Sequence, residues 1–398
     1  MVTILSMRPR SGRGASFGLR VSGFDDLVRV LIAPDKFKGT LTAAQAAQAI
    51  SRGWARIRPD DLISLLPMSD GGDGFGRVIG GLLGARPRRV RTVDAAGRPC
   101  VARWWWEAQS RTAVIESATV IGIAMLPRNR CHPFELHTAG LAKVLAAAAR
   151  LEPLRCFVGI GGSATNDAGF GLARALGWRF LDQLGDEVHT WGRLVECDQV
   201  EEPISALDLG ELTVAVDVRN PLLGPHGCTR VYGPQKGLRP DDFDTAESAL
   251  ARLADLVTKR SGESVAEFPG AGAAGGLGFG LMAFLGAKPA TGFSLFAREA
   301  ELRSRMEGVD LVITGEGCLD RQSVMGKGVG ELGRLCGEAG ALCVAINGRV
   351  ESWGSFPNPF ARVYSMSETE SPVAALLNPG LWLSKTAERA ATEWPGAG

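Results

Sequence analysis

Short apolar runs that pass directly into glycine-rich loops recur along this chain, and this pattern constrains its fold more than any other feature. The clearest case is Cys156-Phe157-Val158, which precedes Ile160-Gly161-Gly162-Ser163-Ala164-Thr165-Asn166-Asp167. Such a junction between a strand and a loop brings backbone N–H groups and small polar side chains to one point. It is typical of a site for a polyanion such as a nucleotide phosphate tail. A single loop of this kind is weak evidence, so the interpretation depends on its recurrence.

Carboxylates follow several predicted strands in the same way. They are Asp35, Asp70, Asp167, Asp217 and Glu316, each beside glycine, proline or a small polar residue. An open parallel sheet binds its ligands outside the carboxyl ends of its strands. A solvated turn accounts for any one of these carboxylates taken alone. If they converge, their mutual repulsion requires a cation, and Mg²⁺ is the cation that we expect.

Predicted strands and helices alternate from Val28 onward. The apolar runs Val28–Ala33 and Leu62–Leu66 flank a helix whose start is marked by the capping pair Thr42 and Gln45. Residues 88–116 instead predict antiparallel strands, with tryptophans 104–106 packing on both faces of one strand. The chain therefore predicts an α/β fold, in which a doubly wound, mostly parallel sheet domain is interrupted by a second, partly antiparallel α/β domain.

The predicted domain boundaries make both domains discontinuous in sequence. Residues 28–86, 130–176 and 288–398 form the Rossmann-like α/β domain, and residues 87–129 and 177–287 form the inserted one. Residues 1–27 lack hydrophobic periodicity, and we interpret them as a disordered leader. A transit-like segment is the alternative interpretation.

Composition limits the classes of partner. The 44 basic and 43 acidic residues give a net charge of +1, so no overall field attracts nucleic acid or an anionic membrane. The eight cysteines are scattered without a CxxC pair, which is typical of buried thiols in a reducing compartment, and we expect a cytoplasmic protein. Residues 270–287 are uncharged, but their glycine content predicts a buried turn and helix instead of a membrane span.

Lysines on glycine-flanked loops provide the opposite charge. They are Lys36, Lys38, Lys236 and Lys327. Together with Mg²⁺ carboxylates and amide cradles, such lysines are the components of phosphoryl transfer. A GxGxxG pattern at 270–275 lacks a preceding strand, and Gly326-Lys327 is followed by Gly328 instead of Ser or Thr. A dinucleotide fold and a Walker P-loop are therefore both disfavoured.

The loops together resemble those of the bacterial glycerate kinase family, type I. Seven blocks carry the resemblance in family order: residues 33–41 (APDKFKGTL), 67–74 (PMSDGGDG), 159–167 (GIGGSATND), 217–222 (DVRNPL), 232–237 (YGPQKG), 270–278 (GAGAAGGLG) and 314–322 (TGEGCLDRQ). The resemblance implies ATP-dependent phosphorylation of D-glycerate, commonly at the 2-hydroxyl, with Mg²⁺. It also implies two α/β domains with the site in the cleft between them. The partners would be glycerate and ATP, with no nucleic acid or membrane, and a homodimer is one option.

The resemblance and the residue chemistry suggest a role for each candidate residue. Expected catalytic residues are Asp70, Asp217 and Lys38. Expected phosphate or nucleotide contacts are Gly161, Gly162, Ser163, Thr165, Asn166, Lys236 and Lys327. Expected substrate contacts are Asp35, Asp73, Asn220, Gln235, Glu316, Asp320 and Gln322. The expected metal ligands are Asp70, Asp217 and Glu316, and the sequence does not decide which carboxylate is the general base.

Two positions depart from the family pattern. Asp73 stands where the family often has glutamate, and Cys318 stands where it often has arginine. If that arginine binds an anion in the family, its loss weakens binding or shifts the substrate, unless Arg321 compensates. The alternatives are a kinase of another small hydroxy acid and a catalytically inactive nucleotide- or metabolite-binding homologue. A nicotinamide oxidoreductase rests on residues 270–275 alone and is the weakest option.

Overall fold

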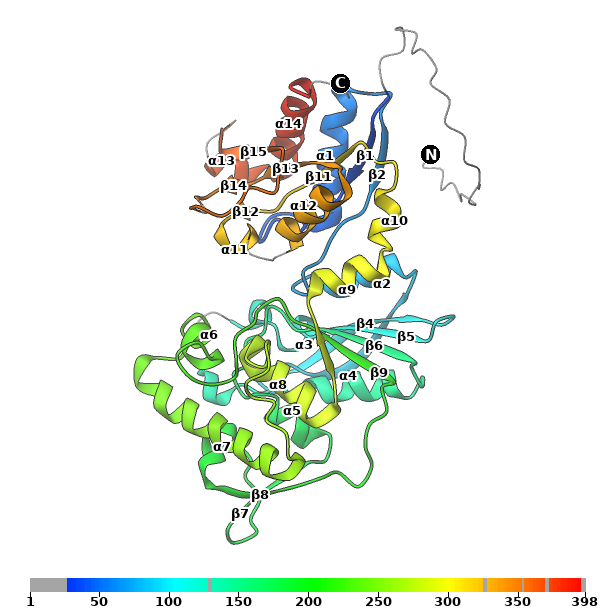
Figure 1. The fold of residues 1–398 in the computed structure, drawn as a ribbon. Coiled ribbons are helices and arrows are strands. Elements are labelled where there is room, and N and C mark those ends of the chain that lie inside the picture. Colours follow the sequence, from blue (N-terminus) through cyan, green and yellow to red (C-terminus); the bar gives the residue numbers. More distant parts are fainter. Residues whose placement is uncertain (1–26, 128–130, 325–327, 353, 369–371, 395–398) are drawn as a thin grey trace.

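Two separate β-sheets, each with its own helices, organise the chain into two lobes (Figure 1). The computed structural model describes residues 27–127, 131–324, 328–352, 354–368 and 372–394, so the predicted leader lies almost entirely outside the described residues. We call the lobe around the five-stranded sheet the first lobe and the lobe around the six-stranded sheet the second lobe. The predicted mixed α/β class with mostly parallel strands is confirmed.

The sheet of the first lobe is entirely parallel. In spatial order its strands are β15 (Arg362–Ser365), β13 (Leu342–Asn347), β11 (Leu311–Thr314), β1 (Arg29–Ile32) and β2 (Leu62–Leu65). Successive residues of the central strands pack on opposite faces, since Val30 and Ile32 belong to one core and Leu31 belongs to another. Helices must cover both faces of such a sheet, as the alternating sequence pattern predicts.

The helices are short to medium in length. They are α1 (Ala43–Ile57), α2 (Phe75–Leu82), α3 (Ala118–Ile121), α4 (Gly140–Ala149), α5 (Phe170–Ala175), α6 (Cys228–Lys236), α7 (Phe243–Ser261), α8 (Ala273–Leu285), α9 (Gly292–Glu299), α10 (Leu302–Met306), α11 (Arg321–Val324), α12 (Gly328–Ala339), α13 (Pro372–Leu377) and α14 (Pro379–Thr392). Helix α1 begins with the predicted capping box of Thr42 and Gln45. Across the described residues, no helix is long and apolar enough to cross a membrane.

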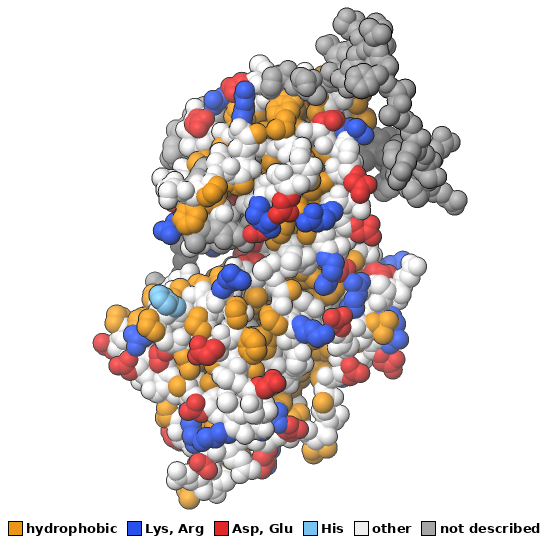
Figure 2. Space-filling view, in the orientation of Figure 1, with side chains coloured by type: hydrophobic (Ala, Val, Ile, Leu, Met, Phe, Trp, Pro, Cys, Tyr) orange, Lys and Arg blue, Asp and Glu red, His pale blue; other side chains and the backbone are white. Residues whose placement is uncertain are grey.

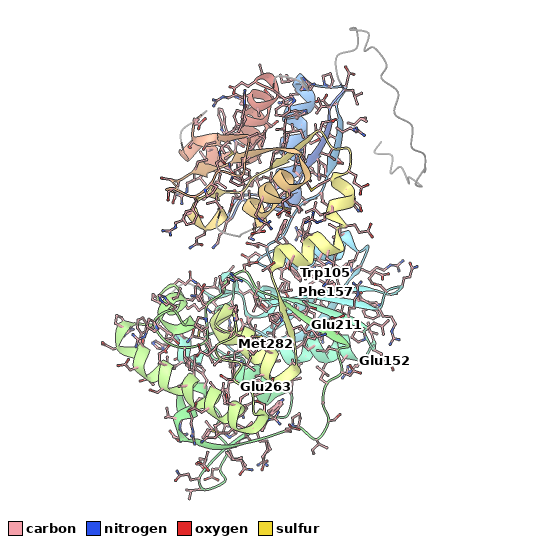
Figure 3. All side chains as sticks on the ribbon, viewed as in Figure 1. Trp105, Glu152, Phe157, Glu211, Glu263 and Met282 are labelled. Atoms are coloured by element: carbon pink, nitrogen blue, oxygen red, sulfur yellow. The ribbon has the colours of Figure 1, made fainter. Side chains whose placement is uncertain are left out.

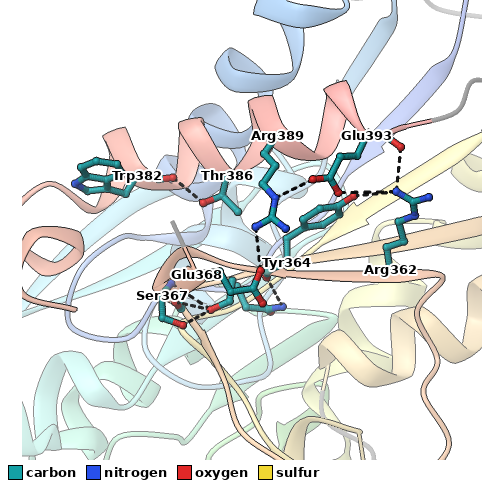
Figure 4. A network of polar contacts seen from close by, with 11 residues as sticks. Arg362, Tyr364, Ser367, Glu368, Trp382, Thr386, Arg389 and Glu393 are labelled. Carbon is teal, nitrogen blue, oxygen red and sulfur yellow. Dashed lines mark hydrogen bonds and ion pairs between the residues drawn. The ribbon is translucent and has the colours of Figure 1, made fainter. Parts of the chain in front are cut away.

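Polar contacts hold α14 against β15 at the edge of the first lobe (Figure 4). The guanidinium of Arg389 donates to Glu368 at 3.0 Å and to Glu393 at 2.9 Å, and it lies 5.6 Å from the ring centre of Tyr364. These side chains are partly exposed, so solvent screens their charges and each pair contributes little to stability. The apolar contact between α14 and α1 is the main attachment of this helix.

The sheet of the second lobe is mixed. In spatial order its strands are β10 (Lys288–Ala290), β9 (Glu211–Ala215), β6 (Arg155–Gly159), β5 (Thr112–Glu116), β4 (Pro99–Glu107) and β3 (Arg86–Val93). The predicted antiparallel strands are confirmed in β3, β4 and β5, whereas β5, β6, β9 and β10 pair in parallel. Two small sheets pair β7 (Arg179–Asp182) with β8 (Cys197–Glu201) and β12 (Cys318–Leu319) with β14 (Arg349–Val350).

The three consecutive tryptophans pack on both faces of β4, as predicted. Trp104 and Trp106 belong to the core beneath the sheet with α4, and Trp105 belongs to the core on the other face. Trp105 and Phe157 lie on the side of the sheet that faces α2 and α9, while Met282 lies farther from these helices (Figure 3). The sheet therefore packs against a core on each face at these tryptophans, and the first lobe adjoins the face that carries Trp105.

In two segments, the predicted domain division differs from the strand pairing that the structure has. We predicted that residues 130–176 belong with the first sheet, yet β6 pairs with β5 and β9 in the second. Strand β10 likewise pairs with β9, although residues 288–398 were expected in the Rossmann-like domain. The central residues of β6, Cys156, Phe157 and Val158, are apolar toward both faces, so its sequence fits the interior of either sheet.

Close packing of α2 against Trp105 leads to a test of stability. A Cβ atom at Gly76 would overlap the Trp105 ring, whereas a Cβ atom at Gly81 of the same helix would meet nothing within 4 Å. We expect Gly76→Ala to lower the free energy of unfolding by about 1–3 kcal/mol, because the ring must move. Gly81→Ala should raise it by up to about 1 kcal/mol, because alanine favours helix. Urea unfolding of both variants measures the difference, and equal effects would contradict the packing.

Candidate active site

One lysine and three carboxylates meet where the two lobes adjoin. Asp35 and Lys36 follow β1, Asp70 lies between β2 and α2, and Asp217 follows β9 of the second lobe. The ammonium of Lys36 lies 2.6 Å from Asp70 Oδ1 and 3.7 Å from Asp35 Oδ2. The charge of Asp217 also acts on Lys36, and the charge of Asp35 acts on Asp217. Carboxyl ends of strands from both sheets therefore face one site.

Glycines allow the backbone segments around this site to approach closely. A Cβ atom on Gly71 would lie 3.2 Å from the Ala215 side chain and 3.5 Å from Asp217 Oδ2. A Cβ atom on Gly161 would lie 2.5 Å from the Cα atom of Gly72, so the loops 69–74 and 161–167 are in direct contact. Both Gly71 and Gly74 also have positive φ angles, which glycine adopts without strain. The glycine-rich loops thus bring the carboxylates together.

Burial and mutual repulsion raise the pKa values of two acids of this site. Desolvation, followed by the negative charge of Asp70, raises the pKa of Asp35 to about 7. Desolvation and Asp70 also raise the pKa of Asp217, against the opposing effect of Lys36. Burial by itself lowers the pKa of Lys36, but Asp35 and Asp70 outweigh it and raise that pKa above its ordinary value. Perturbed groups of this kind are typical of functional sites.

The predicted metal ligands lie at the ends of three strands. Within the described residues, no group of three or more acidic, histidine or cysteine side chains has the spacing of a metal site. Mg²⁺ that also binds substrate phosphates needs only one or two protein carboxylates, and Asp70 and Asp217 supply oxygen donors of this type. Glu316 follows β11, where its backbone N–H donates to Asn347 Oδ1 at 3.2 Å. The residues thus fit a cation that phosphates help to hold.

The glycine-rich loop 161–167 is largely buried beneath the surface of the second lobe. The side chains of Ser163, Thr165 and Asn166 are buried, while Gly162 is exposed and faces Asp73. Asp167 accepts hydrogen bonds from the backbone N–H and hydroxyl of Thr138 at 2.9 Å each. Asp167 therefore connects the loop 161–167 to the segment that precedes α4.

Lys236 inserts its ammonium under this loop. It donates to Ser163 Oγ at 3.1 Å and to the Thr165 carbonyl at 2.6 Å. The Gly275 backbone lies against the same ammonium, in a left-handed turn formed by residues 274–276. Desolvation lowers the pKa of Lys236 to about 8. Lys236 thus joins α6 to the loop from inside the protein.

The pKa of Lys236 predicts how stability changes with pH. In the unfolded chain this lysine titrates near 10.5, so above pH 8 the unfolded state binds more protons than the folded state. Folding is therefore favoured progressively as pH rises from about 8 to 10.5. Between pH 7.5 and 9.5, the free energy of unfolding of the wild type should rise relative to Lys236→Met by on the order of 1 kcal/mol. Urea unfolding measures it, with exposed Lys259→Met as the control, and parallel pH curves for wild type and Lys236→Met would contradict the assignment.

A cavity of about 1070 Å³ opens beside the carboxylates. Its lining includes Asp35 and Lys36, the predicted residues Lys38 and Asp73, and several residues that the sequence prediction missed. The missed charged residues are Arg77, Arg103, Glu116 and Arg305. Lys36 was noted in the sequence but was not assigned a role, although it directly follows Asp35. Arginines on a helix and a strand resemble ordinary surface residues until the fold brings them together.

Glu116 fixes the glycine-rich loop before α2. Its two carboxylate oxygens accept hydrogen bonds from the backbone N–H groups of Gly74 at 2.8 Å and Gly76 at 3.0 Å. Burial raises the pKa of Glu116, and the two hydrogen bonds oppose that rise. A carboxylate at the start of a helix is stabilised by the free N–H groups there. Glu116 thereby connects the end of β5 to the loop that holds Asp70.

The remaining predicted residues lie in several places. Asn220 bonds to the His226 carbonyl and to Tyr232, and Asp320 accepts from the Ser323 N–H and hydroxyl groups. Gln235 lines another cavity, of about 860 Å³, and Gln322 is exposed on α11. Lys327 lies outside the described residues.

The structure identifies the basic residue that lies beside Cys318. Arg349 of β14 is directly opposite Cys318 of β12, and a hydrogen bond between their side chains favours the charged form of Arg349. Arg321 instead lies 5.0 Å from the ring centre of Phe356. Arg349 is therefore the arginine next to this position.

Comparison with known proteins shows the family to which the chain is related. Residues 30–395 match the model of the glycerate kinase family. This chain belongs to the glycerate kinase family. The predicted resemblance is thereby confirmed, and the family assignment identifies the chain as a kinase.

Individual relatives of this glycerate kinase family member agree with the assignment. The chain is 38% identical to a glycerate kinase of Bacillus subtilis over 305 residues, covering 75% of this chain and 79% of the relative. It is 35% identical to a glycerate 2-kinase of Escherichia coli over 305 residues, covering 75% and 80%. A crystal structure from Salmonella typhimurium LT2, described provisionally as a glycerate kinase 2, is similar with a TM-score of 0.78 at 30% identity, covering 92% of this chain and 98% of that one.

Proposed function

We propose that this protein transfers the γ-phosphoryl group of ATP to D-glycerate, at the 2-hydroxyl, with Mg²⁺. The observation that carries the proposal is the group formed by Lys36, Asp35, Asp70 and Asp217 at the junction of the lobes, beside a large cavity. Phosphoryl transfer asks the protein to align donor and acceptor and to neutralise charge. The names of the relatives support glycerate as the acceptor.

In this proposal Asp217 is the general base. Asp70 is held by Lys36 and accepts the Gly72 N–H at 3.1 Å, whereas no hydrogen bond from another side chain to Asp217 is found in the described part of the chain. The Asp217 carboxylate takes the proton of the hydroxyl as that oxygen bonds to the γ-phosphorus. The bond from this phosphorus to the bridging oxygen breaks, and its electron pair leaves with ADP.

Charge neutralisation falls to the remaining groups of the site. The ammonium of Lys36 stabilises the negative charge that develops on the transferring group, and Asp70 orients the ammonium through the 2.6 Å contact. Bound Mg²⁺ would further neutralise the phosphate oxygens, with Asp70 as the protein ligand. Asp217 is then left to accept the proton.

A coupled assay of ADP release tests this function. We expect turnover with D-glycerate and ATP, and a lower kcat/KM with hydroxypyruvate, tartronate or glycolate as acceptor. A higher kcat/KM with one of these acids would show a kinase of another hydroxy acid, which the cysteine at position 318 motivates. Binding of ATP without release of ADP would show an inactive homologue instead.

The cellular setting follows from cysteine chemistry. All eight cysteines are free thiols, and burial raises the pKa of Cys156 and Cys228 to about 12. Thiols of this kind persist in a reducing compartment. We therefore propose a cytoplasmic location for the protein.

A further inference from the structure

The cavity of about 1070 Å³ carries an unusual distribution of charge. Lys38 from the first lobe and Arg77 and Arg103 from the second lobe line it. All three side chains belong to exposed residues, and none has an ion pair or a hydrogen bond to an acid among the residues that the structure describes. On the face drawn in Figure 2, Lys and Arg side chains lie on both lobes along their boundary.

The acidic residues of the cavity do not neutralise these three cations through direct pairs. Asp35 lies against Lys36, and Glu116 is bonded to two backbone N–H groups. Asp73 faces the exposed Gly162. The charge of Arg77 acts on Glu116, but the two side chains form no ion pair. Positive charge is therefore left over on the cavity wall.

The strand register adds independent evidence at Arg103. Arg103 of β4 is paired directly with Arg89 of β3, so the two side chains leave the sheet on the same face. Like charges in directly opposed positions destabilise a sheet. Neither arginine has an ion pair with an acidic side chain in the described ranges, so no described residue compensates the repulsion. An anionic ligand beside Arg103 would relieve it.

An apolar wall adjoins the cations. Trp105 lines the cavity together with Leu41, Leu65, Leu82 and Val101, and Leu65 and Val101 are 43% and 59% exposed. Arg103 shares a strand face with Val101 and Trp105, because the three alternate along β4. Basic groups next to exposed apolar side chains suit a ligand that combines phosphates with a flat, weakly polar ring system.

We propose that this cavity binds the nucleoside triphosphate donor, with its phosphates contacting Lys38, Arg77 and Arg103. The inference rests on the proposed kinase function and deepens it. It assigns the donor to the cavity at the boundary between lobes and not to the loop 161–167, whose side chains Ser163, Thr165 and Asn166 are buried. The terminal phosphate then lies toward Lys36 and Asp70, which line or adjoin the same cavity.

Steady-state kinetics with Arg77→Gln and Arg103→Gln tests the proposal. Each variant should raise the KM for ATP about 10-fold or more, since a charge-assisted hydrogen bond is lost. The KM for D-glycerate and kcat should stay within about 3-fold of the wild type. The matched control is Arg88→Gln, an exposed residue of β3 that is opposite Trp104 and so lies on the other sheet face.

Two further measurements separate binding from stability. Calorimetry without glycerate should show weaker ADP binding to both variants, and tripolyphosphate should compete with ADP for the wild type. Arg103→Gln should also leave the melting temperature of the free protein unchanged or raised, because the repulsion with Arg89 is removed. A merely structural arginine would lower it.

The outcomes distinguish this inference from the proposed function. An active wild type whose variants keep the KM for ATP and the Kd for ADP would overturn the cavity assignment and leave the kinase function standing. A rise in the KM for D-glycerate alone would also overturn it, because the cavity would then hold the acceptor carboxylate. A wild type that binds ADP at this cavity but forms no product with glycerate would instead refute the proposed function.

Discussion

Replacing Asp217 by asparagine should lower kcat for glycerate phosphorylation by about 100-fold to 10,000-fold, the usual contribution of a general base. The asparagine side chain has nearly the same shape, so it fills the same space beside Gly71 and Ala215. It cannot accept the hydroxyl proton. Because burial and Asp70 raise the pKa of Asp217, the carboxylate is a stronger base than an exposed aspartate. The KM for ATP should change much less than kcat.

The control for this variant is Asp255→Asn. Asp255 is exposed on α7, and no hydrogen bond or ion pair of its side chain is found in the described residues. Its kcat should equal that of the wild type. Circular dichroism and a thermal melt establish that Asp217→Asn is folded. A folded Asp217→Asn enzyme with near-normal kcat would show that another group takes the proton, and Asp35 would be the next candidate.

Replacing Lys36 by methionine should have two large effects. It removes the ammonium that contacts both Asp35 and Asp70, and breaking such a partly buried arrangement costs about 3 kcal/mol. It also removes a charge that stabilises the transferring phosphoryl group, which lowers kcat by about 100-fold or more. Thermal melts and steady-state kinetics measure the two losses separately.

A double variant separates these two effects of Lys36. Adding Asp35→Asn to Lys36→Met removes a carboxylate that has lost its contact with the Lys36 ammonium, so the melting temperature should recover while kcat stays low. Lys143→Met, at an exposed lysine of α4, should change neither quantity. Recovery of kcat along with the melting temperature would mean that Lys36 only balances charge. No loss in either measurement would contradict the central place of Lys36 in the site.

Local sequence patterns predicted much of the fold. The capping box of Thr42 and Gln45 and the packing of tryptophans 104–106 depend on neighbours within a few residues, and both are present as predicted. The sheet to which β6 belongs depends on strands far away in the sequence. Its central residues, Cys156, Phe157 and Val158, are apolar on both faces, so either sheet could have accommodated it. Pairing information of this kind is absent from a single sequence.

The carboxylates of the candidate site could also be predicted from local sequence patterns. Asp35, Asp70 and Asp217 each follow a strand and lie beside small residues, and this pattern marks the ligand-binding edge of a sheet. Arg103 was not predicted, because its meaning depends on the register that places it opposite Arg89. The burial of Lys236 could not be predicted either, because lysines on glycine-flanked loops usually point into solvent.

Phosphorus NMR of a mixture of the wild-type enzyme, D-glycerate, ATP and Mg²⁺ tests the central claim most directly. The account predicts that the ATP signals are replaced by those of ADP and by a new phosphate monoester. Its phosphorus should be a doublet, because a phosphate on carbon 2 couples to a single proton. A triplet would place the phosphate on carbon 3 and contradict the assigned position. Unchanged ATP with no monoester signal would contradict the proposed activity itself.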